Sequence, residues 1–153
     1  MGNLIIFVQR INLIKQLYIL FFFFFTSLAF PNPSQWKQEN YNDTNYSNLV
    51  STEYVYEINQ VWGNGEGPSG CGNDNFSIIW TGNVYVPDAD TYYFKAPCLD
   101  NSEHLYINNV HIGSLSQDWI EGNSYYLEEG FYSFELRFVE ATEYACASLA
   151  WSM

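Results

Sequence analysis

Residues 131–139 read FYSFELRFV, and this stretch decides the fold because its side chains alternate between apolar and polar. The apolar members share one parity and the polar members share the other: Tyr132, Phe134, Leu136 and Phe138 against Ser133, Glu135 and Arg137. Successive side chains of a β-strand point to opposite faces of the sheet. The stretch therefore predicts a strand with one face in a core and the other in water.

Similar runs of aromatic and β-branched residues lie around this stretch, separated by Gly, Pro, Asn and Asp. Residues 61–75 contain five glycines and are expected to form a loop. No segment after Ala29 shows ten residues of helical period with caps. We expect an all-β fold, a single antiparallel β-sandwich spanning residues 53–153. Its further strands are predicted at residues 53–58, 76–86, 91–96, 104–107, 124–127 and 145–151.

Residues 1–29 have the composition of a secretory signal peptide. Arg10 and Lys15 precede a short apolar stretch, and small residues stand at a cleavage site after Ala29. The alternative is an uncleaved membrane anchor, but Lys15 interrupts the roughly 20 apolar residues that a spanning helix needs. We therefore expect a secreted, extracellular protein with no membrane insertion after the signal peptide is cleaved.

Residues 30–52 are polar and rich in Asn, and we predict that they form a flexible leader into the domain. Three glycosylation sequons begin at Asn42, Asn45 and Asn75. Glycans at these positions would agree with export, although such short motifs also arise by chance.

The charge balance restricts the partners. Three basic residues follow position 30, against all 17 acidic residues of the chain. So acidic a domain repels phosphate backbones and anionic membrane surfaces, which excludes nucleic acid as an expected partner. Carboxylate, amide and carbonyl oxygens are instead the ligands that calcium prefers. The alternative role of the charge is solubility.

The three cysteines, Cys71, Cys98 and Cys146, allow one disulfide and one leftover thiol. Their spacing matches no zinc motif. Disulfides persist in secreted proteins, so this usage agrees with export. The residues alone leave the pairing open.

Several segments in fixed order carry a resemblance. They are Phe76–Gly82, Val86-Pro87, Thr91–Phe94, Leu99–Asn109, Leu127–Tyr132 and Leu149–Trp151. Together they resemble the PA-fourteen domain, which is named after a toxin's protective antigen and occurs in glycosidases and fungal adhesins. The order covers residues 62–151, and it is most similar to the flocculin- and GLEYA-type adhesin lectins.

In those lectins a calcium ion bridges protein and sugar, held by an Asp-Asp pair in one loop and an Asn plus carbonyls in another. The resemblance places Asp100 and Asn101 at the paired acids and Glu140 at the family's Asn, with Thr142 and Tyr144 supplying backbone carbonyls. An amide thus replaces one acid, and an acid replaces the amide. The resemblance implies calcium as the cofactor.

The same resemblance implies a disulfide between Cys98, just before the first loop, and Cys146, just after the second. A pairing through Cys71 remains the alternative. Sugar sites combine aromatic faces with polar hydrogen-bonding groups, and aromatic residues make up 20% of the chain. We expect Trp119, Tyr144 and His104 to contact the ligand.

Catalysis is not expected. The pairs Asp88 with Asp90 and Glu128 with Glu129 lie in predicted turns, and no nucleophile–base motif accompanies the two histidines. The sequence therefore predicts a non-enzymatic, carbohydrate-binding, adhesin-like domain whose partners are glycans or cell-surface glycoproteins. The alternative is a structural or protein-interaction sandwich without a sugar site, and a glycoside hydrolase is a less favoured third.

Overall fold

The computed structural model describes residues 35–118 and 121–153. Regular structure in this part of the chain is β-strand, apart from the three-residue 3-10 turn Glu121–Asn123. The strands are β1 (Trp36–Tyr41), β2 (Leu49–Val55), β3 (Asn59–Asn64), β4 (Phe76–Val86), β5 (Asp90–Lys95), β6 (Ser102–Ile107), β7 (Val110–Ser114), β8 (Ser124–Leu127), β9 (Gly130–Glu140), β10 (Tyr144–Ser148) and β11 (Ala150–Ser152).

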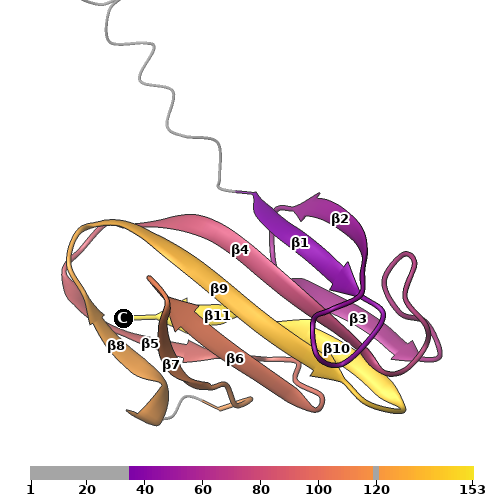
Figure 1. The fold of residues 1–153 in the computed structure, drawn as a ribbon. Coiled ribbons are helices and arrows are strands. Elements are labelled where there is room, and N and C mark those ends of the chain that lie inside the picture. The colour runs from indigo at the N-terminus through magenta and orange to yellow at the C-terminus, as the bar shows by residue number, and fades with distance from the viewer. Residues whose placement is uncertain (1–34, 119–120) are drawn as a thin grey trace, which may run out of the picture. The chain divides into compact units, whose positions relative to one another are not determined.

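The strands form one broad sheet and two small ones, all antiparallel. The broad sheet has the order β2-β1-β4-β9-β6-β7, and the small sheets are β11-β5-β8 and β10-β3. β4 and β9 are the long central pair, in register from Phe76 opposite Glu140 to Val86 opposite Gly130. Figure 1 shows the small sheets behind the broad one, so the fold is the predicted β-sandwich. Among the described residues, no helix is long or apolar enough to cross a membrane.

Aromatic rings from both layers fill the core. The ring of Trp62 stacks on Phe138 with centroids 5.9 Å apart and meets the edge of Phe76 at 5.7 Å. Phe94 of β5 packs edge-on against Phe134 of β9 at 5.8 Å, which joins a small sheet to the broad one. Aromatic pairs in these offset and edge-on arrangements add to the stabilisation from buried area. The inward side chains of β9 are those that its alternation predicts.

Residues 36–52 are not a flexible leader, which corrects the prediction from their polar composition. They form β1 and the start of β2 at the edge of the broad sheet. Gln38 is buried, and its Oε1 accepts a 2.9 Å hydrogen bond from the indole Nε1 of Trp80. Its Nε2 donates to Asn40 Oδ1 at 2.9 Å, and Asn40 Nδ2 donates to Ser51 Oγ at 2.9 Å. Buried amides need such partners, and here they tie β1 to both neighbours.

Other boundaries also differ from the sequence-based expectations. Only residues 53–55 of the strand expected at 53–58 are in a strand, as the end of β2, while residues 56–58 form the bend before β3. β3 extends into the expected glycine-rich loop. β7 was not predicted. Trp151 of β11 has an exposed fraction of 42% because β11 lies at the edge of its small sheet. The predicted signal peptide and Trp119 lie outside the described residues.

Candidate functional site

A disulfide fixes the loop that connects β5 to β6. Cys98 is bonded to Cys146 of β10, with Cα atoms 5.8 Å apart, as the resemblance implied. Cys71 is the free thiol among the described cysteines. Beside the disulfide, the backbone N–H of Asp100 donates to the carbonyl of Cys146 at 3.3 Å. The amide N–H of Cys98 donates to Ser148 Oγ at 2.7 Å. The loop is therefore held against β10 at several points.

Asn101 lies between two carboxylates at the end of this loop. Its φ of 53° is in the left-handed region, which Asn tolerates better than most residues. Its Nδ2 donates to Asp100 Oδ2 at 2.6 Å and to Glu140 Oε2 at 2.9 Å. The two carboxylate oxygens can thus lie no farther apart than these two bonds placed end to end. The structure brings together the three side chains that the resemblance placed in one site.

Glu140 is a buried acid with a free oxygen. It is the last residue of β9, on the inward parity of Phe138, and its side chain has no solvent exposure. Its Oε1 has no hydrogen-bond partner. Burial raises the pKa of Glu140 to about 7, and the charges of Asp100 and Asp74 act in the same direction, while the hydrogen bond from Asn101 opposes them. An orphaned buried carboxylate oxygen is costly unless a ligand or cation reaches it.

Asp74 is a neighbour that sequence reasoning missed. It precedes β4, whose first residue pairs with Glu140, so the register brings it beside the loop after β9. Its Oδ1 accepts a 3.1 Å hydrogen bond from the backbone N–H of Glu143, and the N–H of Asn75 donates to the carbonyl of Ala141 at 3.2 Å. Thr142 lies in this exposed turn. The available signal was an acid two residues before the predicted strand 76–86, and only the β4–β9 pairing shows that this acid lies near Glu140.

Tyr144 and His104 face different surroundings. Tyr144 begins β10, pairs with Asn64 along the backbone and has an exposed fraction of 44%, so its ring is accessible close to Glu140 in the chain. His104 lies between two buried residues of β6 and so projects from the outer face of the broad sheet. Its side-chain contacts are His111 and Ser114. His104 and Glu140 therefore point to opposite faces of the broad sheet.

Glu103 is a second buried acid behind the disulfide. It has no solvent exposure, and its Oε1 accepts a 3.1 Å hydrogen bond from the backbone N–H of Ser148. Burial raises the pKa of Glu103 to about 9, and the Ser148 hydrogen bond acts against this shift. At neutral pH the side chain is a neutral acid that links β6 to β10. No feature of the sequence separated Glu103 from its exposed acidic neighbours.

The sequons lie on the surface. Asn42, Asn45 and Asn75 are all exposed, although Asn42 Oδ1 accepts a 2.9 Å hydrogen bond from the backbone N–H of Gly72. Ser77, the third residue of the last sequon, is buried and donates to the carbonyl of Asp43 at 2.7 Å. Glycosylation at all three positions stays a prediction.

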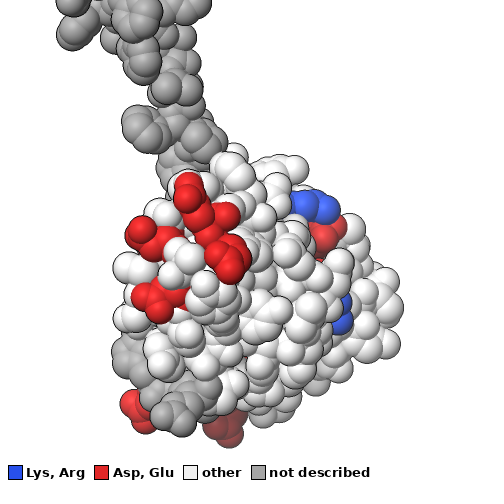
Figure 2. Space-filling model, turned by 90° about the vertical axis from the view of Figure 1, so that its left-hand side faces the viewer, with Lys and Arg blue, Asp and Glu red and all other residues white. Residues whose placement is uncertain are grey.

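The remaining acids include two pairs at turns. Asp88 lies between β4 and β5, and Asp90 is the first residue of β5. Glu128 and Glu129 lie between β8 and β9, so both pairs are at the opposite ends of β4 and β9 from the site. Tyr85 donates its hydroxyl to Glu129 Oε1 at 2.6 Å. Figure 2 shows acidic side chains gathered on one face with few basic ones. Within residues 35–118 and 121–153, no three His, Cys, Asp or Glu side chains come close enough to form a metal cluster.

The fold and the site define a class: an antiparallel β-sandwich with acidic side chains converging at loops at one end of its central strands. Residues 32–153 match the model of the PA14 domain, the PA-fourteen domain of the sequence resemblance, and the chain belongs to this family. Comparison with curated protein sequences gives no significant match.

Three solved structures illustrate the fold. An anti-sigma factor domain-containing protein from Clostridium clariflavum is 23% identical with a TM-score of 0.68, covering 78% of this chain and 42% of that one. The PA14 domain of the antifreeze protein MpAFP is 18% identical with a TM-score of 0.54, covering 78% and 84%. The Epithelial Adhesin 9 A domain of Candida glabrata, in complex with Galβ1-4GlcNAc, is 10% identical with a TM-score of 0.52, covering 79% and 83%. This chain spans less than half the length of the anti-sigma factor domain-containing proteins.

Proposed function

We propose that this protein is a secreted, non-enzymatic carbohydrate-binding domain of the adhesin-lectin kind, which binds sugar at the Asp100–Asn101–Glu140 site. One observation carries the proposal. One carboxylate oxygen of Asp100 and one of Glu140 both accept a hydrogen bond from Nδ2 of Asn101. The second oxygen of Glu140, Oε1, is buried and has no hydrogen-bond partner. Closely spaced carboxylates with unused lone pairs can accept hydrogen bonds from vicinal hydroxyls or can hold a hard cation.

The comparisons support this proposal at the level of the fold. The Candida glabrata adhesin domain that shares the sandwich was crystallised with a galactose-containing disaccharide. Its identity to this chain is 10%, so the proposed sugar site depends on the residues of this chain rather than on transfer from that protein. We infer that the partners are glycans or cell-surface glycoproteins.

The side chains fit calcium in their chemistry. Asp100 and Glu140 offer carboxylate oxygens, and Asn101 offers an amide oxygen once its side chain turns to point Oδ1 inward. The backbone carbonyls of Thr142 and Tyr144 would complete the set. A bound calcium ion would supply positive charge and open coordination positions for sugar hydroxyls. Since two acids and one amide leave a small net charge at the site, we expect weak affinity, because calcium affinity follows the charge of the ligands.

Next to these ligands, the exposed ring of Tyr144 would pack on the apolar face of a sugar. Trp119 remains a predicted second contact. Secretion follows, in this proposal, from the signal peptide at residues 1–29, and the extracellular location agrees with the disulfide. Glycans at Asn42, Asn45 and Asn75 belong to the same proposal.

A second function is favoured by one specific contact. Because the Asn101 amide donates to both carboxylates, it supplies part of what a ligand would supply. A sandwich in which this bridge only ties the β5–β6 loop to β9 would be a structural or protein-interaction module. The two functions differ in whether mutation of Glu140 affects glycan binding.

The test is a glycan array probed with the purified protein, once with calcium and once with a chelator. The variants are Glu140→Gln and, as a matched control at the far end of the domain, Asp88→Asn. We expect binding to a restricted set of glycans, strengthened by calcium, abolished in Glu140→Gln and unchanged in Asp88→Asn. Equal binding by both variants would place the sugar elsewhere, and no binding by the unmodified protein in either condition would favour the interaction module.

A further inference from the structure

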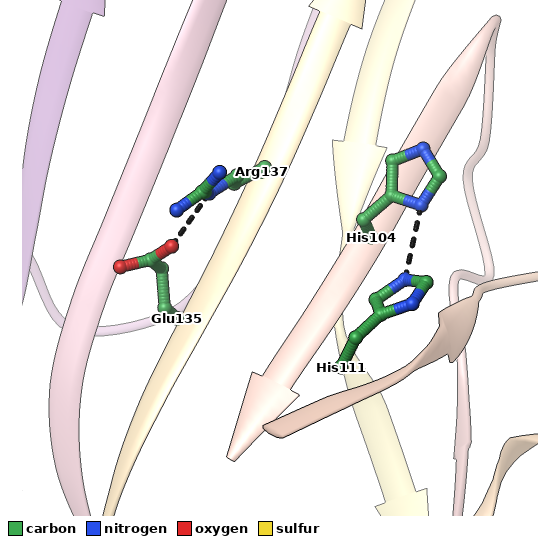
Figure 3. A network of polar contacts seen from close by, with 4 residues as sticks. All are labelled: His104, His111, Glu135 and Arg137. Atoms are coloured by element: carbon green, nitrogen blue, oxygen red, sulfur yellow. Dashed lines mark hydrogen bonds and ion pairs between the residues drawn. The ribbon is translucent and has the colours of Figure 1, made fainter. Parts of the chain in front are cut away.

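A pair of histidines on the outer face of the broad sheet forms a second polar cluster. The hairpin β6–β7 closes through Asn108 and Asn109, whose φ values of 49° and 64° are both left-handed, as a tight two-residue hairpin turn requires. Pairing then sets Tyr106 opposite His111 and His104 opposite Ser114, with a register shift between them. The imidazoles of His104 and His111 consequently lie on the same face, as Figure 3 shows.

The two rings point nitrogen toward nitrogen. His104 Nδ1 lies 3.3 Å from His111 Nε2, and Ser114 Oγ lies 3.1 Å from the same His104 nitrogen. Two imidazole nitrogens bound to one tetrahedral zinc ion at about 2.0–2.1 Å lie roughly 3.3 Å apart. The separation of the two nitrogens therefore matches the separation expected in a zinc chelate.

We propose that His104 and His111 form a chelating site for a divalent transition-metal ion, with zinc as the reference ion and Ser114 Oγ as a neighbouring oxygen donor. The site is separate from the Asp100–Asn101–Glu140 site in place and in chemistry. Imidazole suits zinc, copper and nickel, whereas calcium and magnesium take oxygen ligands. No third His, Cys, Asp or Glu joins the pair among residues 35–118 and 121–153, so water fills the other positions.

The protonation of His104 agrees with metal binding. Partial burial lowers the pKa of His104, and His111 and Arg137 lower it further, which favours the neutral ring that binds a metal. In the metal-free pair one ring donates its N–H to the other. For both nitrogens to face a metal, the donor ring must carry its hydrogen on its other nitrogen, which is a change of tautomer without net proton loss.

One cation lies near the site. Arg137 pairs with His104 across β6 and β9, but its guanidinium lies 4.7 Å from the centroid of the Tyr106 ring and forms a 2.6 Å ion pair with Glu135. Figure 3 shows this ion pair turned away from the two imidazoles. Glu135 thus offsets the repulsion that Arg137 would exert on a metal ion, and the excess of acidic residues over the whole domain attracts cations.

The test is a calorimetric titration of zinc into the protein carrying Cys71→Ser, which removes the free thiol as a competing ligand. The chain contains only two histidines, so His104→Gln and His111→Gln dissect the pair completely. Loss of either ring should weaken zinc binding by about tenfold or more, because the second ligand of a chelate acts at high effective concentration. The double variant should be little weaker than either single variant.

Two readouts keep the result specific. Ring signals of both histidines in NMR spectra should shift together up to one equivalent of zinc, while calcium should leave them in place. Thermal unfolding checks that each variant is folded, and Glu128→Gln in an exposed turn serves as the control that keeps full zinc affinity. Equal zinc affinity in the histidine variants and the parent, or no zinc binding at millimolar concentration, would overturn the proposal.

Discussion

The disulfide between Cys98 and Cys146 should account for a large share of the stability of this domain. The perturbation is the double substitution Cys98→Ala with Cys146→Ala, which removes the bond without leaving a buried thiol pair. The bond closes a loop of 48 residues. In the chain-entropy account a loop of this length stabilises the folded state by about 4 kcal/mol. Small domains are stable by roughly 5–15 kcal/mol, so the double variant should remain folded but be much less stable.

The assay is guanidinium unfolding followed by tryptophan fluorescence, with Cys71→Ala as the matched control that keeps the disulfide. The control should lose less than about 1.5 kcal/mol, since Cys71 is only partly buried. A loss below about 1 kcal/mol in the double variant would refute the reasoning. It would mean that the hydrogen bonds of Asp100 and Cys98 to β10 hold the loop without the covalent bond.

Three further outcomes are expected. Gln38→Ala removes the acceptor of the buried Trp80 indole N–H and should cost about 1–3 kcal/mol in urea unfolding; an unchanged midpoint would mean that the Trp80 N–H finds another partner. Gly67→Ala would place a Cβ 2.2 Å from the carbonyl oxygen of Gly72, so its melting temperature should fall, and an equal value would show that the loop adapts. Burial raises the pKa of the Cys71 thiol to about 11; its alkylation rate should therefore keep rising tenfold per pH unit up to about pH 11, whereas a plateau near pH 9 would indicate an ordinary exposed thiol.

The sequence was most informative where the core is purely apolar. The alternation in residues 131–139 predicted β9 and its inward face, because each inward side chain there is a large apolar group. The same logic failed at β1, whose inward side chains include Gln38 and Asn40. These buried amides form hydrogen bonds with each other and with the Trp80 N–H, so a strand of the core can have a polar sequence. Hydrophobic periodicity cannot detect a strand that is buried through hydrogen bonds.

The candidate site, like the fold, could be predicted from the sequence only in part. Asp100, Asn101 and Glu140 could be grouped from the family resemblance, and the structure brings their side chains together. Asp74 joins them because of the β4–β9 register, which no local pattern in the sequence reveals. His104 is close to Asp100 in the chain, but strand alternation turns its side chain to the outer face of the broad sheet. The face of the sheet to which a side chain points therefore predicts a shared site better than closeness in the sequence does.

Calcium titration of the purified protein, followed by isothermal calorimetry, tests the central claim most directly. The account predicts one binding event that is lost in Glu140→Gln, is weakened in Asp100→Asn and persists in Asp88→Asn at the far end of β4. The same calcium-loaded sample should then bind its glycan more tightly than the chelated one. Equal calcium heats in Glu140→Gln and the unmodified protein would contradict the account.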